Sequence, residues 1–131
     1  MHAKSAESFK AAIALESQNT NGAANRAYYA VYQAIVAELS KDHSAEDIDA
    51  TIKDRKSDPF YDGPEWRHAF CRDGNTLTKY LSLDRRERQL VKEAWNLRVR
   101  ADYFLENVRP EEIANVMEGL RKLLPTLGVT I

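Results

Sequence analysis

The chain has 131 residues, the usual length of a single domain that buries a hydrophobic core without disulfides or metal ions. Its formal net charge is -1, so the chain as a whole lacks the positive charge of a general nucleic-acid binder, and any such contact has to come from a local patch. The one cysteine, Cys71, excludes an internal disulfide and a cysteine-based zinc site, and we expect it to be a buried small residue.

The chain carries no sign of export or of insertion into a membrane. Its first residues include charges at helical spacing and lack the apolar stretch of a secretion signal. The longest apolar-looking stretch, over residues 28–39, is interrupted by Gln33 and Glu38 and is shorter than the about 20 residues that span a bilayer. We therefore expect a soluble, cytoplasmic protein without membrane contacts.

Helical periodicity continues along the whole sequence, and no stretch alternates between apolar and polar residues as a strand would. This pattern predicts an all-α fold, an antiparallel up-and-down bundle of four to five helices in one domain, residues 1–131. The first helix is expected over residues 3–17, with Phe9 and Ile13 facing inward and Ser8 facing outward. A turn over residues 19–22 leads to a second, alanine-rich helix over residues 23–40, which packs back along the first.

The middle of the chain is less regular. Residues 41–63 form an irregular insertion that includes a short helix from residue 44 to about residue 55. A third helix is expected to begin at Pro64, with an interruption at Asp73 and Gly74.

The last two predicted helices have clear start signals. Asp84 followed by Glu87 is typical of a capping box and opens the fourth helix, which ends near residues 107–110. Pro110 occupies the first position of the last helix, and Pro125 is expected to end it.

Two dense polar clusters lie within these helices, over residues 25–32 and 98–103. Arg98 and Asp102 are four residues apart and are therefore neighbours, on the helix face of Val91 and Trp95 rather than that of Leu90 and Leu97. Buried Arg, Asp and Tyr side chains are costly unless they satisfy one another. The clusters are therefore either an internal polar lock or a functional site, and the tyrosines of the first cluster suit core packing as well as binding.

Taken together, Asn25-Arg26-Ala27-Tyr28-Tyr29-Ala30-Val31-Tyr32 and Arg98-x-x-Ala101-Asp102-Tyr103, with Trp66-Arg67-His68 between them, resemble the HEPN (higher eukaryotes and prokaryotes nucleotide-binding) domain family. The resemblance implies a helical bundle that is commonly a homodimer, often encoded beside a nucleotidyltransferase or within a toxin-antitoxin or defence system. It also implies a ribonuclease signature, an Arg followed after four to six residues by a His. Here the fifth residue after Arg98 is Tyr103, and no Arg in the chain is followed at that distance by a His.

The missing histidine matters because metal-independent RNA cleavage needs one group to take a proton from the 2'-hydroxyl and another to protonate the leaving oxygen. A tyrosine hydroxyl, with an ordinary pKa of about 10, does this poorly at neutral pH. The leading expectation is therefore an RNA- or nucleotide-binding HEPN-like protein without the nuclease motif. Its expected site residues are Arg26, Arg98 and Arg100 as phosphate ligands, Tyr29 and Tyr103 as stacking or hydrogen-bonding groups, and Asn25 and Asp102 as supporting residues.

Two alternatives remain open. In one, the protein is an active metal-independent ribonuclease toxin in which His68 replaces the missing histidine and Arg98 stabilises the charged phosphorane. In the other, it is a non-catalytic partner module of a nucleotidyltransferase, and both clusters form a polar lock. The scattered histidines have no metal-ligand spacing, so neither a metal nor another cofactor is expected.

Overall fold

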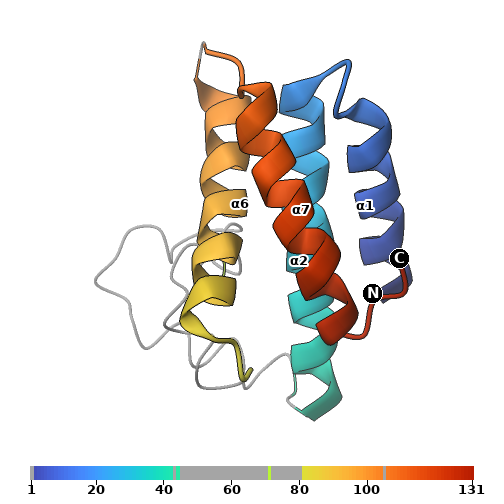
Figure 1. Cartoon of the computed structure of the whole chain (residues 1–131). Coiled ribbons are helices and arrows are strands. Elements are labelled where there is room, and N and C mark those ends of the chain that lie inside the picture. The colour runs from blue at the N-terminus through green and yellow to red at the C-terminus, as the bar shows by residue number, and fades with distance from the viewer. Residues whose placement is uncertain (1, 43, 45–70, 72–80, 105) are drawn as a thin grey trace.

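The computed structural model describes residues 2–42, 44, 71, 81–104 and 106–131 of the chain. This part contains four helices and no strand: α1 (His2–Leu15), α2 (Thr20–Asp42), α6 (Arg85–Tyr103) and α7 (Pro110–Thr126). Figure 1 shows that they run alternately up and down. The predicted all-α bundle is confirmed, whereas the helices expected over residues 44–55 and after Pro64, and the histidine at 68, lie outside the described residues.

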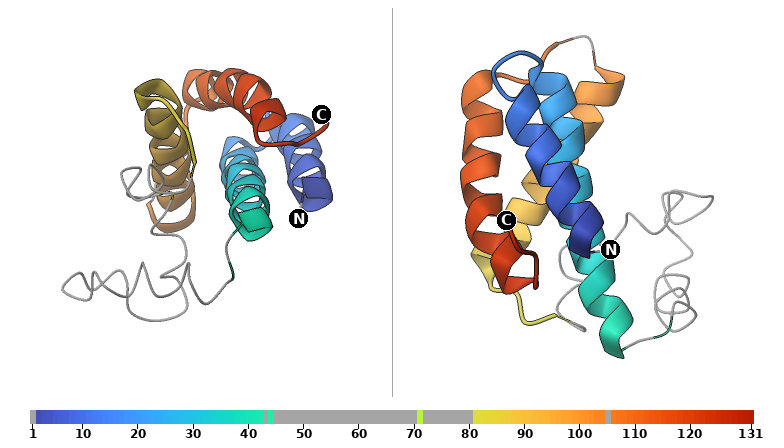
Figure 2. Two further views of the ribbon diagram at one scale, coloured as in Figure 1. Left: turned by 90° about the horizontal axis from the view of Figure 1, so that it is seen from below. Right: turned by 90° about the vertical axis from the view of Figure 1, so that its right-hand side faces the viewer.

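Helix α2 is the central element and contacts the other three helices, as the end-on view in Figure 2 illustrates. Its buried face is largely alanine, and small side chains let a neighbouring helix approach closely. On the α1 side, the Ser5 hydroxyl donates to the Ala30 carbonyl oxygen at 2.6 Å, and the Ser8 hydroxyl donates to Gln33 Oε1 at 2.8 Å.

These contacts correct the predicted orientation of α1. Ser8, expected outside, is buried, and Ile13, expected inside, is 42% exposed. The short side chains of Ser5 and Ser8 fit against the alanine face of α2. Both hydroxyls form hydrogen bonds there, so their burial leaves neither of them unpaired. The bulkier Ile13 is turned toward solvent.

The core lies between the four helices and is formed mainly by aromatic and aliphatic side chains. Its largest fully buried members include Phe9, Tyr28, Ile35, Leu39, Ile113, Met117, Leu120 and Leu124. Helix α6 contributes a broader inner face than predicted, because Leu97 and Arg98 are both buried and Leu90 is half-buried. Both the face of Leu97 and the face of Val91 and Arg98 are therefore covered by the bundle.

Three helices begin at residues with a local start signal. The Asp84 carboxylate accepts from the Glu87 backbone N–H at 2.8 Å, and Glu87 Oε1 accepts from the Asp84 N–H at 3.0 Å, which confirms the predicted capping box. Pro110 is the first residue of α7, as predicted. Helix α2 begins at Thr20, earlier than expected, because the Asn19 side chain accepts from the Gly22 N–H at 2.9 Å and acts as an N-cap.

The end of α7 differs from the prediction, since the helix continues through Pro125 to Thr126. Gly128, with φ of 81°, adopts the left-handed conformation and donates its N–H to the Pro125 carbonyl at 3.1 Å. The Val129 N–H donates to the Leu124 carbonyl at 3.1 Å, which completes a Schellman motif. Proline removes only one backbone donor, so the glycine rather than the proline ends this helix.

Asn21, in the first turn of α2, binds the connection between α6 and α7. Its side-chain Nδ2 donates to Asn107 Oδ1 at 2.9 Å, and its Oδ1 accepts from the Val108 backbone N–H at 2.8 Å. These bonds fix the entry to α7 against the start of α2. None of the helices in the described part of the chain combines the length and apolar character needed to cross a membrane.

Candidate functional site

The two sequence motifs meet where α2 packs against α6. Arg98 Nε lies 3.0 Å from Asp102 Oδ2, within one helix, and the guanidinium carbon lies 5.6 Å from the centroid of the Tyr28 ring on the neighbouring helix. Asn25 Nδ2 reaches both carboxylate oxygens of Asp102, at 3.4 and 3.5 Å. We call Asn25, Tyr28, Arg98 and Asp102 the arginine cluster.

Burial differs sharply across this cluster. The side chain of Arg98 is 10% exposed and that of Asp102 is 31% exposed, so the carboxylate is the outer member of the ion pair. Tyr28 is fully buried. A guanidinium held between a carboxylate and an aromatic face keeps much of the stabilisation that water would otherwise supply.

Tyr28 is the functional-site residue that sequence reasoning missed. The motif suggested Tyr29, but Tyr28 contacts Arg98. The spacing of the motif could not distinguish the two, because the rotation of α2 about its axis depends on how its alanine face packs. Tyr28, Tyr29 and Tyr32 form one aromatic group, with ring centroids 5.3 to 6.2 Å apart.

Cys71 is buried, as expected, and interacts with Tyr28. A side-chain hydrogen bond joins the Tyr28 hydroxyl and the Cys71 thiol. Burial, together with the nearby Cys71, raises the pKa of the Tyr28 hydroxyl far above its usual range, and burial raises the pKa of the Cys71 thiol to about 12. Both groups are therefore neutral at physiological pH, and neither is an activated nucleophile.

Arg100 points to a different neighbour, Glu112 near the start of α7. Its Nη1 donates to Glu112 Oε2 and its Nη2 donates to Oε1 at 3.0 Å, a bidentate pair. The Arg109 backbone N–H and Nε also donate to Oε1, each at 3.2 Å. The hydrogen bonds from Arg100 lower the pKa of the Glu112 carboxyl to about 2, with further help from Arg109.

The end of α6 exposes two large aromatic side chains. Tyr103 is 71% exposed and Phe104 is 62% exposed. Together with Arg100 and Glu106 they line an open hollow of about 620 Å³. The aromatic pair follows Asp102 directly in the chain, so the hollow and the arginine cluster belong to the same end of the bundle.

Arg26 is not part of this group. It is exposed on the α1 side of α2, where it lines a separate groove of about 350 Å³ with Lys4, Glu7 and Gln33. In a single chain, Arg26, Arg98 and Arg100 therefore face three different neighbours and do not form one phosphate site. Of the expected residues, the structure brings together Asn25, Arg98 and Asp102, with Tyr29 in the adjoining aromatic group and Tyr103 on the adjacent surface.

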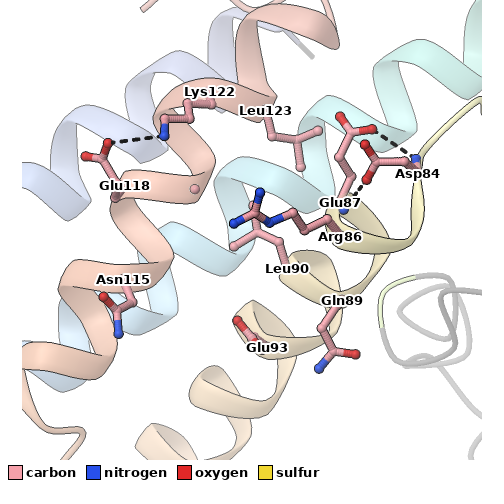
Figure 3. Close-up of a pocket in the computed structure, with 11 residues that line it drawn as sticks. Asp84, Arg86, Glu87, Gln89, Leu90, Glu93, Asn115, Glu118, Lys122 and Leu123 are labelled. Carbon is pink, nitrogen blue, oxygen red and sulfur yellow. Dashed lines mark hydrogen bonds and ion pairs between the residues drawn. The ribbon is translucent and has the colours of Figure 1, made fainter.

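A third groove, of about 510 Å³, runs between α6 and α7 and contains none of the expected site residues (Figure 3). Its lining includes the carboxylates Asp84, Glu87, Glu93 and Glu118 and the cations Arg86 and Lys122. Its floor is tight, since a Cβ added at Gly119 would lie 2.7 Å from both methyl carbons of Leu90. This side of α6 is therefore acidic on balance and does not favour a phosphate backbone.

The described residues contain no group of three or more His, Cys, Asp or Glu side chains placed to hold a metal ion. His68, the proposed substitute for the motif histidine, lies outside them. Comparison of the chain with protein-family models, with curated proteins and with solved structures finds no match. The resemblance to HEPN domains therefore rests on the two sequence motifs.

Proposed function

We propose that the chain is a HEPN-like protein that binds RNA or a nucleotide and lacks efficient nuclease activity, with its binding surface at the C-terminal end of α6. The observation that carries the proposal is the exposed pair Tyr103 and Phe104 beside the arginine cluster. Large exposed aromatic side chains are costly in water unless something covers them. Single-stranded bases stack on such side chains while neighbouring cations contact the phosphates.

The roles of the other residues follow from their surroundings. Arg100 lines the hollow with the aromatic pair, and Arg98 supplies a second positive charge on the same helix, held in place by Asn25 and Asp102. Tyr29 packs against Tyr28 and supports the cluster from α2. Arg26 is a phosphate ligand in this proposal only for a polynucleotide long enough to pass around α2, or for one held between two copies of the chain.

Fluorescence anisotropy with a labelled single-stranded RNA oligonucleotide, in EDTA and at low salt, tests the proposal. Tyr103→Ala and Phe104→Ala are each expected to weaken binding about fivefold or more, since stacking contributes about 1–3 kcal/mol per base. Ile13→Ala, which removes an exposed apolar side chain from α1, is the matched control and should bind as the wild type does. Equal affinities for all four proteins would contradict the proposed surface.

Incubation with RNA in EDTA separates this proposal from the ribonuclease toxin. A protein that only binds leaves the RNA intact over hours, because loss of one general acid or base costs about 10²- to 10⁴-fold in rate. Cleavage that disappears in both His68→Ala and Arg98→Ala would instead favour the toxin.

A second candidate function is a non-catalytic partner module of a nucleotidyltransferase, the partner class that the resemblance implies. The burial of Arg98 between Asp102 and Tyr28 favours it, because this geometry is that of a polar lock. Here the exposed aromatic pair covers a protein surface rather than RNA. The second candidate gains support if the wild type binds no RNA while Arg98→Ala loses stability.

A further inference from the structure

Asp102 lies where a ligand phosphate would reach Arg98. Its side chain is about three times as exposed as that of Arg98, at 31% against 10%, and its Oδ2 lies 3.0 Å from Arg98 Nε. Carboxylates and phosphates form the same kind of charge-assisted hydrogen bond with a guanidinium. An incoming phosphate and Asp102 therefore compete for one group.

We infer that Asp102 is a built-in anion that occupies Arg98 in the free protein and is displaced when a phosphate of the RNA or nucleotide binds. The inference rests on the proposed function and adds a competing residue to it. Asp102 then sets the affinity and favours ligands that carry enough negative charge to replace it. Asp102 therefore lowers the affinity of the protein for phosphate, because it already neutralises Arg98.

The restraints on Asp102 suit a residue that moves. Asn25 holds the carboxylate only through contacts of 3.4 and 3.5 Å, at the long end of hydrogen bonding. Asp102 is the penultimate residue of α6, and the last turn of a helix opens at little cost. Arg98, by contrast, is one turn further inside and packs on the Tyr28 ring.

The position of Tyr103 and Phe104 couples the stacking of a base to the displacement of Asp102 from Arg98. Tyr103 and Phe104 directly follow Asp102, and Phe104 leaves the helix with φ of -112° and ψ of 154°. A base that stacks on either ring places its phosphate within reach of the end of α6. Stacking and displacement of Asp102 therefore act on the same short segment.

The test measures RNA affinity in Asp102→Asn, which keeps the shape of the side chain and removes its charge. We expect binding about threefold to tenfold tighter than in the wild type at low salt, because the change removes the carboxylate that competes with phosphate for Arg98. Glu93→Gln is the matched control, because it removes an exposed carboxylate from the same helix, in the groove between α6 and α7 that contains none of the proposed binding residues.

A second background isolates the role of Arg98. Combined with Arg98→Gln, the Asp102→Asn change should no longer tighten binding, because the competition it relieves is gone. Circular dichroism of each variant confirms that it is folded. An equal gain in Glu93→Gln, or a gain that persists in the Arg98→Gln background, would mean that the effect comes from net charge alone, and it would overturn the inference.

The possible failures are distinguishable. If wild-type RNA binding depends on Tyr103 but Asp102→Asn binds no tighter, the inference fails and the proposed function stands. If neither the wild type nor Asp102→Asn binds the oligonucleotide, both fail.

Discussion

Arg98 combines deep burial with a permanent positive charge. Removing such a group from water is costly, and the cost is offset here by the Asp102 carboxylate and the face of Tyr28. Both of these partners are helical side chains, Asp102 on α6 and Tyr28 on α2. The position of the guanidinium is therefore determined by the packing of α2 on α6.

Replacing Arg98 tests how much the arginine cluster stabilises the fold. Arg98→Ala is expected to lower the free energy of unfolding by about 1–3 kcal/mol, since it removes the ion pair and the ring contact. Arg98→Lys, which keeps the charge without the planar guanidinium, should lose less. Urea unfolding monitored by circular dichroism measures both.

Arg85→Ala serves as the control, because Arg85 is an exposed arginine on the same helix. It should unfold within about 0.5 kcal/mol of the wild type. Arg98→Ala behaving like Arg85→Ala would mean that the cluster contributes little to stability.

Sequence reasoning predicted the parts of this site that depend on one helix. The spacing of Arg98 and Asp102 places them together whatever surrounds them. It did not predict the contact with Tyr28 or the separation of Arg26 from Arg98, because both depend on how α2 is rotated between its neighbours. Periodicity alone does not determine that rotation when the buried face of a helix is mostly alanine.

At the scale of elements, Glu112 connects α6 to α7. Hydrogen bonds from Arg100, with help from Arg109, lower the pKa of its carboxyl from 4.5 to about 2. Because the folded-state pKa lies below the unfolded one, the stabilisation is complete above about pH 4.5 and is lost as the pH falls toward about 2.

Glu112→Gln should therefore be less stable than the wild type at neutral pH and approach it as the pH falls through this window. Urea unfolding at several pH values from about 7 to about 3 measures the difference between the two proteins. A difference that stays constant, or grows toward acid, would contradict the role assigned to this carboxylate.

Gly128 ends α7 in a conformation that favours glycine, with φ of 81°. A Cβ there would also lie 2.9 Å from Glu38 Oε1 and 3.1 Å from His2 Nε2. We expect Gly128→Ala to lower the free energy of unfolding by about 1–2 kcal/mol, the usual cost of a left-handed non-glycine residue. Gly128→Asn should cost less if the backbone conformation dominates, and thermal unfolding of both variants decides this.

Two helix starts were predictable because each has a local sequence signal. Asp84 with Glu87, and Pro110, identify their helix starts by local chemistry that needs no tertiary contact. Pro125 misled the prediction because a helix tolerates proline in its last turn when a glycine cap follows. The orientation of α1 was also missed, since it depends on serine hydroxyls finding partners on α2.

At the scale of the whole molecule, charge favours a local rather than a general binding surface. The net charge is -1, and the groove between α6 and α7 is acidic on balance. The resemblance to HEPN domains leads us to propose a homodimer, in which symmetry doubles every surface of the chain and places two arginine clusters in one assembly. Light scattering of the purified protein should give twice the mass of 14.9 kDa, and a single-chain mass would remove the dimer from the account.

The most direct test of the proposed binding surface is an NMR titration of the isotope-labelled protein with a single-stranded RNA oligonucleotide. We predict that the largest changes in backbone amide shifts occur over residues 98–104, with smaller ones around Asn25. The groove lined by Glu93, Gly119 and Lys122 should change little and provides an internal control. Shifts confined to that groove, or none at saturating RNA, would contradict the claim that the end of α6 binds nucleic acid.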